Sequence, residues 1–529
     1  MQIALFENSN KTRITEVLFF SFLPVLFCFI TLLYFGFDLR DFAPYYSDEL
    51  HYWNEINSLS AVGFDGGYSV INETPSKFHI SPFGPHGPGF PVIGGVYSLF
   101  FGWRLYSPLI LNSLVLSLSL FAFFWTVPIN RIQRLLISGF LTTSFFVFNF
   151  LATGMQETVN QSIGILLALL IVKIIGCRTS NSVPNCVWKS KNFTFFLIVT
   201  FTVVRASWGV IFAAVVLFLG RRGSRPYQQV FSSILLLFVS VTVITCIYSP
   251  VTKIGQIDLF VDYVLTGNIE SFRSFVATVT NNIRSFWGLG RGVGFIEALL
   301  RYELTALIIY LVYLVGITKN KTNLSKDQKL IGWISLSILL TSITLVILFY
   351  EVGSWRDYRV LAPSFICVFL LITCNGKHLK FLSLLLLLQI SVLPLVVPTF
   401  TGFRRLNFLG TTTKEHRLEE TINASVVYSP DVNRWCNTML LFSPGVSDNR
   451  INRMLWRPEA GIAISVVHDL ESLVLPIQSK YIFFSKKGRD MFLLKGGQVD
   501  HLSPMVDVGA KGIIYENYGS KCKFEGTNN

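Results

Sequence analysis

Long apolar runs recur along most of this 529-residue chain and constrain its fold more than any other feature. A helix needs about 20 apolar residues to cross a bilayer. With 51% hydrophobic and only 14% charged residues, the chain cannot be an ordinary soluble globular protein. We therefore predict a polytopic α-helical membrane protein. About eleven crossings are expected, near residues 15–37, 107–127, 135–152, 160–176, 193–204, 208–220, 230–249, 302–318, 330–350, 360–375 and 380–400.

Basic residues set the predicted orientation in the lipid bilayer. They fall mostly in short loops between the apolar runs, and positively charged loops stay on the cytoplasmic side. The net charge of +13 is thus assigned to orientation, and nucleic acid is not an expected partner. Lys11 and Arg13 place the N-terminus on the cytoplasmic side, so an odd number of crossings places the C-terminus on the exoplasmic side. The lack of a retention signal favours a bacterial inner membrane, with the C-terminus in the periplasm or outside.

The stretch from 193 to 220 is predicted to cross the membrane twice. Basic loops flank it on both ends, so a single crossing would place one of them outside. A break that runs from Arg205 to Gly209 interrupts the middle of this stretch, and two short helices would meet there. Unsatisfied backbone is costly in lipid, so the break should be covered by protein or line a cavity. Such a break often lines a binding site.

Two domains are expected. Residues 1–400 form the transmembrane catalytic domain, whose first exoplasmic loop spans 38–104, and residues 401–529 form a small exoplasmic α/β domain. The second domain contains two cysteines, Cys436 and Cys522, which an oxidising compartment would allow to form a disulfide. Its predicted strands are 424–428, 439–442, 462–467, 481–484 and 512–515, with helices over 448–455 and 468–473.

An acidic pair, Asp48 and Glu49, follows the first apolar run and should emerge on the outer side of the membrane. A carboxylate there can act as a general base on an acceptor hydroxyl or amine, and Asp48 is the best placed. An equally good reading makes Asp48 the N-cap of a helix that starts at Glu49. The pair could help to bind Mg²⁺ or Mn²⁺, but two adjacent carboxylates supply too few ligands for a closed site.

Arginines on the same side form the second part of the predicted site. Arg205 lies at the break, and Arg356 and Arg359 precede the tenth crossing. The guanidinium group binds phosphate oxygens bidentately and stays charged. Each arginine could instead reach a lipid headgroup or form a salt bridge. Arg205 favours a phosphate site most, because it interrupts an apolar run.

Four stretches resemble the GT-C glycosyltransferases, polytopic enzymes that take a sugar from a polyprenyl phosphate and include protein O-mannosyltransferases and aminoarabinose transferases. Ser-Asp-Glu at 47–49 matches the acidic motif of the first exoplasmic loop, and the sequence at 86–91 is similar to the proline-containing segment before the next crossing. Residues 201–209 resemble the hairpin where relatives often place Thr-Lys-Gly, although arginine stands there in this chain. Residues 356–363 contain arginine and tyrosine followed by proline, which resembles the sequence that enters a late transmembrane helix in this family.

The resemblance implies an inverting glycosyltransferase that acts on the exoplasmic face. Asp48 and Glu49 would be catalytic, with Asp48 as general base, and Arg205, Arg356 and Arg359 would bind the donor phosphate. The partners implied are a polyprenyl-phosphate-linked sugar, an acceptor glycan, lipid or protein, and the bilayer. Two other classes stay open: a polymerase or ligase of lipid-linked glycans, and a lipid-glycan transporter or flippase. Substrate-binding residues would be His51, His86, Tyr358 and Arg291.

Overall fold

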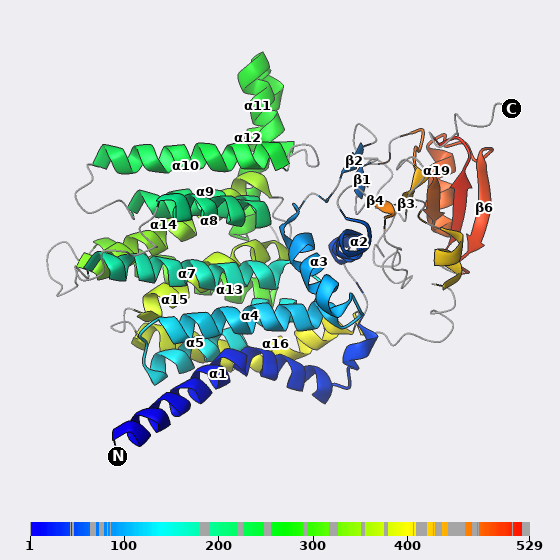
Figure 1. Cartoon of the computed structure of the whole chain (residues 1–529). Coiled ribbons are helices and arrows are strands. Elements are labelled where there is room, and N and C mark those ends of the chain that lie inside the picture. The colour runs from blue at the N-terminus through cyan, green and yellow to red at the C-terminus, as the bar shows by residue number, and fades with distance from the viewer. Residues whose placement is uncertain are drawn as a thin grey trace. The chain divides into compact units, whose positions relative to one another are not determined.

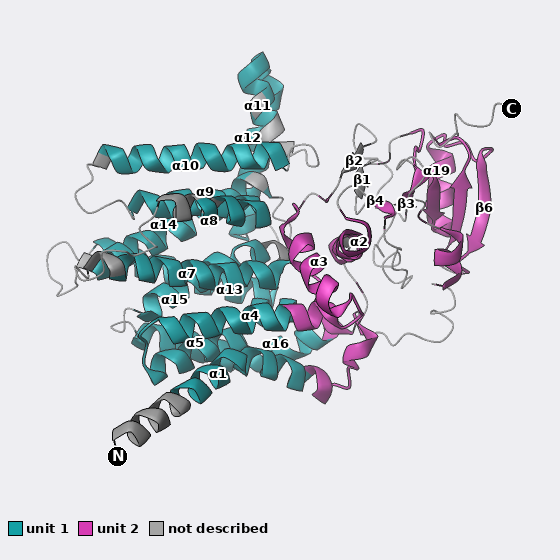
Figure 2. Cartoon of the chain, in the orientation of Figure 1, with its two compact units in different colours: residues 1–31, 112–152, 156–401 teal, residues 32–111, 153–155, 402–529 magenta. Residues whose placement is uncertain are grey.

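Contacts divide the chain into two compact units, which are coloured separately in Figure 2. Unit 1 comprises residues 1–31, 112–152 and 156–401, and unit 2 comprises residues 32–111, 153–155 and 402–529. The computed structural model describes residues 2–520 except 43, 45–46, 64–69, 73–78, 82, 85, 180–190, 219–225, 248–254, 289–293, 317–325, 351–354, 375–378, 406, 409–419, 427, 429–435, 443–460, 468–472, 474 and 510–511.

Unit 1 is built from helices (Figure 1). They are α1 (Gln2–Tyr34), α4 (Ser107–Thr126), α5 (Arg131–Thr143), α6 (Phe145–Leu151), α7 (Glu157–Thr179), α8 (Lys191–Val204), α9 (Ala206–Phe218), α10 (Pro226–Ile247), α11 (Gly255–Thr266), α12 (Ile269–Phe286), α13 (Phe295–Gly316), α14 (Lys326–Phe349), the 3₁₀ helix η4 (Trp355–Val360), α15 (Ala362–Cys374) and α16 (Leu379–Arg404).

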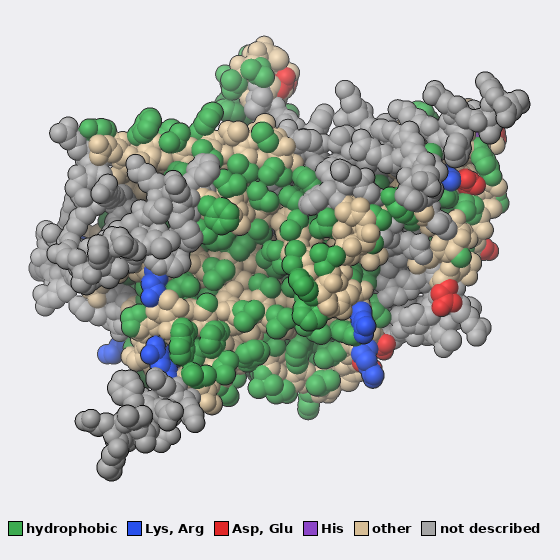
Figure 3. Space-filling model, in the orientation of Figure 1, with side chains coloured by type: hydrophobic (Ala, Val, Ile, Leu, Met, Phe, Trp, Pro, Cys, Tyr) green, Lys and Arg blue, Asp and Glu red, His purple; other side chains and the backbone are tan. Residues whose placement is uncertain are grey.

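Seven helices in the described part of the chain are long and apolar enough to cross a membrane. On the face shown in Figure 3, hydrophobic side chains gather over the helices of unit 1, and few charged side chains lie among them. Phe231 and Phe238 of α10 are 66% and 68% exposed, which is the pattern of a helix that faces lipid. These features indicate a multi-pass membrane protein, as predicted. The seven are parts of α1, α4, α7, α10, α13, α14 and α16.

The remaining predicted crossings are shorter or broken. Helices α5 and α6 together make an eighth candidate, bent by 63° at Ser144. Helices α9 and α15 have 13 residues each, about 20 Å of helix against about 30 Å of hydrocarbon. Most of α15 is nevertheless buried among other helices. The count of eleven crossings therefore stays a prediction.

The hairpin predicted around Arg205 is present. Helix α8 ends at Val204 and α9 begins at Ala206, so Arg205 itself is the break. The ring of Phe201 lies 6.2 Å from the ring of Phe212. In one straight helix, eleven residues would separate them by about 16 Å. The two helices therefore fold back on each other.

Helices α7 and α15 approach each other closely at Gly164. A Cβ atom at this residue would lie 2.3 Å from the carbonyl oxygen of Pro363 on α15. Small residues permit such close contact between helices in membranes, where packing rather than hydrophobic exclusion holds helices together. This contact lies close to functional candidates, because α7 begins at Glu157 and α15 follows Arg359.

Unit 2 contains a seven-stranded mixed sheet in the order β2-β1-β4-β3-β5-β7-β6. Strand β1 pairs in parallel with β4, so the sheet includes part of the first loop. The sequence assigned that loop to the transmembrane domain, whereas contacts group it with the C-terminal segment. The elements of unit 2 are η1 (Leu39–Asp41), α2 (Ser47–Val62), β1 (Val70–Asn72), β2 (His79–Ser81), α3 (Gly89–Phe101), β3 (Thr438–Phe442), β4 (Ala463–Val467), β5 (Tyr481–Phe484), α19 (Lys486–Leu494), β6 (Leu502–Asp507) and β7 (Ile513–Asn517).

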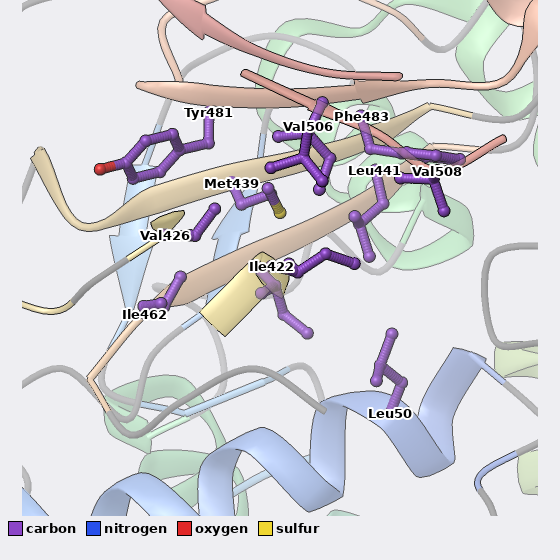
Figure 4. Close-up of a cluster of buried hydrophobic side chains, with 12 residues drawn as sticks. Leu50, Ile422, Val426, Met439, Leu441, Ile462, Tyr481, Phe483, Val506 and Val508 are labelled. Carbon is purple, nitrogen blue, oxygen red and sulfur yellow. The ribbon is translucent and has the colours of Figure 1, made fainter. Parts of the chain in front are cut away.

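Helix α2 is fixed to this sheet. Leu50 of α2 is 2% exposed and belongs to the hydrophobic cluster drawn in Figure 4, with Met439 and Leu441 from β3. The amide Nδ2 of Asn54 donates to the carbonyl of Ile462 at 2.8 Å, and Ser58 Oγ accepts from the amide of Gly461 at 2.8 Å. The sheet thus determines where the acidic end of α2 lies within unit 2.

The predicted strands of the C-terminal segment are mostly confirmed. Strands β3, β4, β5 and β7 match the expected runs, whereas β6 and α19 were not predicted. The strand expected over 424–428 is wrong, because residues 420–425 are helical. Ile422 and Val426 are both buried against the sheet, and their spacing of four is that of a helix face. The helices expected over 448–455 and 468–473 fall largely or wholly outside the described residues.

Cys436 is disulfide-bonded. Its predicted partner, Cys522, lies outside the described residues.

Candidate functional site

Asp48 lies inside the first turn of α2, which begins at Ser47. An N-cap residue precedes its helix, so this placement does not favour the cap reading. The carboxylate oxygen Oδ2 of Asp48 lies 3.8 Å from Nε2 of His86, and the Asp48 side chain is 27% exposed. The ring of His86 packs against that of Tyr52, with centroids 5.6 Å apart. Two of the predicted site residues, Asp48 and His86, are therefore together and reachable from solvent.

Glu49 is buried, unlike its neighbour. Its Oε1 accepts the backbone N–H of Gly154 at 2.6 Å, and its Oε2 accepts from Nδ2 of Asn407 at 3.1 Å. These bonds hold three segments of unit 2 together, and both carboxylate oxygens are used. The geometry therefore favours an anchoring role for Glu49, whereas the sequence treated it as catalytic beside Asp48.

Glu55 adds a carboxyl group that was not among the predicted site residues. It lies seven residues after Asp48, two helical turns along the same face of α2, and is 1% exposed. Its Oε1 accepts the backbone N–H of Gly84 at 2.6 Å. Burial raises the pKa of Glu55 from 4.5 to about 8; the Gly84 hydrogen bond opposes the rise, and the negative charge of Asp48 adds to it. The spacing from Asp48 was the signal that could have identified it.

The loop before α3 is attached to α2 by these two carboxyl groups. Glu55 holds Gly84, and Asp48 pairs with His86 two residues later. His51, another predicted site residue, is partly exposed and lies one turn before Glu55. This end of α2 therefore combines a solvent-accessible carboxylate, two imidazoles and a buried acid, the groups used in proton transfer.

A second charged cluster lies in unit 1 at the break between α8 and α9. Arg205 is 8% exposed, hydrogen-bonds Tyr350 and feels the negative charge of Glu157. Nε of Arg359 lies 3.1 Å from Oε1 of Glu157, which is itself buried. Trp208 of α9 donates to Asn160 Oδ1 at 2.9 Å, which fixes the hairpin against the helix that carries Glu157.

Guanidinium groups outnumber carboxylates among the described side chains of this cluster, which has two of the first and one of the second. Within the described residues, Nη1 of Arg205 is buried and has no hydrogen-bond partner, and the same is true of Oε2 of Glu157. A buried guanidinium group with a free donor favours an anion, and phosphate oxygens fit the guanidinium fork.

The other predicted residues lie elsewhere or are not described. The hydroxyl of Tyr358 is buried, donates to the carbonyl of Phe286 and accepts from Nε of Arg301 at 2.8 Å. Both functions of that hydroxyl are thus used in holding η4, which does not favour direct contact with substrate. The side chain of Arg356 and the whole of Arg291 lie outside the described residues.

Across the described residues, no three His, Cys, Asp or Glu side chains form a group that could hold a metal ion. A Mg²⁺ or Mn²⁺ requirement stays an open prediction.

Comparison of the chain with protein-family models, with curated proteins and with solved structures found no match.

Proposed function

We propose that the chain is a membrane glycosyltransferase that moves a sugar from a polyprenyl-phosphate donor to an acceptor hydroxyl or amine on the exoplasmic face. The observation that carries the proposal is the cluster of Arg205, Arg359 and Glu157, where the buried Arg205 has a free Nη1 donor that fits a phosphate leaving group. A membrane-embedded phosphate site suits a lipid-linked donor. The bacterial inner membrane, with the C-terminal segment in the periplasm, belongs to the same proposal.

Asp48 supplies the base. The acceptor oxygen or nitrogen attacks the anomeric carbon, the bond from that carbon to the phosphate oxygen breaks, and its electron pair stays on the phosphate. Asp48 takes the acceptor proton, and attack on the face opposite the departing phosphate inverts the configuration of that carbon in a single displacement. The partial exposure of Asp48 lets an acceptor reach it, and Nε2 of His86 lies 3.8 Å from its carboxylate oxygen. Arg205 and Arg359 offset the charge that develops on the departing phosphate.

The test is sugar transfer from a panel of radiolabelled polyprenyl-phosphate sugars by the purified full-length chain in nanodiscs. We expect Asp48→Asn to lower kcat about 10²–10⁴-fold, the usual contribution of a general base. Asp490→Asn, which removes an exposed carboxylate on α19, is the matched control and should leave transfer unchanged. Transfer that is equal in wild type and Asp48→Asn would exclude the assigned base.

A lipid-glycan transporter is the second candidate, and one observation favours it. Transporters are expected to have broken helices in pairs. Among the described residues, one helix is broken by a 63° bend at Ser144 between α5 and α6, and a second interruption of an apolar run is the hairpin turn at Arg205 between α8 and α9. Donor binding without release of polyprenyl phosphate, together with movement of the intact donor across a vesicle membrane, would support this class instead.

A further inference from the structure

Glu303 is an acidic residue inside an apolar helix. It lies eight residues beyond the start of α13 at Phe295, about 12 Å along a helix long and apolar enough to span a membrane. Its side chain is buried, with 3% exposure. Ionisable residues inside membrane spans are expensive and are commonly functional. The glycosyltransferase reaction proposed above does not use Glu303.

The neighbours of Glu303 are neutral and polar. Its side chain hydrogen-bonds Gln389 of α16, whose Oε1 accepts the hydroxyl of Thr143 at 2.8 Å. Within the described part of the chain, Oε1 of Glu303 has no hydrogen-bond partner. The arginine nearest to it in sequence, Arg301, is held by Glu297 and Tyr358. Among the residues that the structure describes, no basic partner of the kind that normally neutralises a buried carboxylate accompanies Glu303.

The free oxygen belongs to a residue that lines a cavity at the break between α5 and α6. Glu303, Ser144 and Tyr358 are the polar residues of its wall, and the rest is apolar, including Leu304 and Phe365. Helix α5 ends at Thr143 and α6 begins at Phe145, so Ser144 lies at the C-terminal end of α5 and at the N-terminal end of α6. The C-terminal end of a helix carries partial negative charge and favours a cation. Broken membrane helices hold Na⁺ or H⁺ in this manner.

We propose that Glu303 and Ser144 form a binding site for a monovalent cation at the cavity, with Na⁺ and a proton on Glu303 competing for it. Carboxylate and hydroxyl oxygens suit a hard cation. One positive charge neutralises the single carboxylate, whereas a divalent ion would leave a buried excess of +1. Tyr358 is the other titratable side chain on the cavity wall, and its hydroxyl is already hydrogen-bonded on both sides.

The test is thermal unfolding of the full-length chain in nanodiscs, with NaCl replaced by N-methyl-D-glucamine chloride at constant ionic strength. The unfolding midpoint should rise with the logarithm of sodium concentration above the binding constant. The rise should be larger at pH 8 than at pH 6, because protons compete for Glu303. Glu303→Gln should abolish the sodium effect. Glu270→Gln removes an exposed carboxylate on α12 and should behave as wild type.

Glu303→Asp keeps the charge on a shorter side chain and should need more sodium for the same rise. It provides a readout if Glu303→Gln does not fold. A wild-type midpoint that does not respond to sodium at pH 8 would overturn the cation site. A sodium response that survives in Glu303→Gln would overturn the assignment to this residue. Neither outcome depends on sugar transfer.

Discussion

At the scale of single residues, three carboxyl groups on α2 occupy three environments. Asp48 is partly exposed beside His86, Glu49 is buried with both oxygens hydrogen-bonded, and Glu55 is buried with one backbone N–H. Burial and hydrogen bonding, rather than position in sequence, determine which carboxylate can accept a proton from a substrate. This separates adjacent acids that look equivalent in the sequence.

Glu55 gives the chain a pH-dependent stability. Its pKa is 4.5 as an ordinary group and about 8 when folded. Between these values the folded chain keeps a proton that the unfolded chain has released, so stability falls as pH rises from 4.5 to about 8 and then levels off. Glu55→Gln should reduce this slope by up to about 1.4 kcal/mol per pH unit. Unfolding midpoints at several pH values measure it.

Glu420→Gln, an exposed carboxylate in the same unit, serves as the control. Equal pH slopes in wild type and Glu55→Gln would show that Glu55 titrates normally.

The phosphate assignment of Arg205 rests on its guanidinium geometry. Arg205→Lys keeps the charge but loses the fork, so the KM for the donor should rise about tenfold, and Arg205→Ala should raise it about 10–100-fold. Steady-state kinetics with the lipid-linked donor measure both. Arg273→Ala, on the exposed face of α12, should change neither. A donor KM unaffected by Arg205→Ala would remove Arg205 from the phosphate site.

At the scale of elements, the sheet of unit 2 holds the helix that carries Asp48. Leu50→Ala should destabilise unit 2 by about 2–4 kcal/mol, because it leaves a cavity in the cluster of Figure 4. Leu494→Ala, at an 84% exposed position on α19, should have little effect. Denaturant unfolding monitored in unit 2 distinguishes them. Similar losses in the two variants would mean that Leu50 does not anchor α2.

The contact between α7 and α15 should determine how well Glu157 meets Arg359. Gly164→Ala forces the helices apart at Pro363 and should both destabilise the chain and raise the donor KM. Gly176→Ala lies on the same helix with nothing within 4 Å of the added carbon, and should be neutral or stabilising by up to about 1 kcal/mol. Thermal unfolding and donor kinetics of the pair provide the comparison.

The helical part of the fold was largely predictable, and the sheet's first-loop strands were not. Apolar runs of 20 residues determine a helix by length alone, and Arg205 marked its hairpin because a charge interrupts such a run. Strands β1 and β2 have three residues each, too few to show a period, and β1 pairs with a strand nearly 400 residues away, Val70 opposite Ile464. The hydrogen bonds of Glu49 could not be predicted either, because they join residues distant in sequence. The same holds for Oε1 of Glu303, which has no hydrogen-bond partner among the described residues.

At the scale of the whole molecule, the proposed topology predicts which surfaces face outside. In a background with Cys177, Cys186, Cys246 and Cys374 replaced by Ser, Leu494→Cys on α19 should react with a membrane-impermeant maleimide added to intact spheroplasts. Arg131→Cys at the start of α5 has an 82% exposed native side chain and should react only after lysis. The opposite pattern would invert the topology, and the base could not then lie on the exoplasmic face.

Cleavage of a sugar–phosphate bond with Asp48 as the base is tested by the stoichiometry of polyprenyl phosphate released and sugar transferred. The full-length chain in nanodiscs is compared with its Asp48→Asn variant. We expect one phosphate released for each sugar transferred in wild type, and loss of both in Asp48→Asn. Bound donor that is never cleaved, in wild type and variant alike, would exclude the proposed glycosyltransferase.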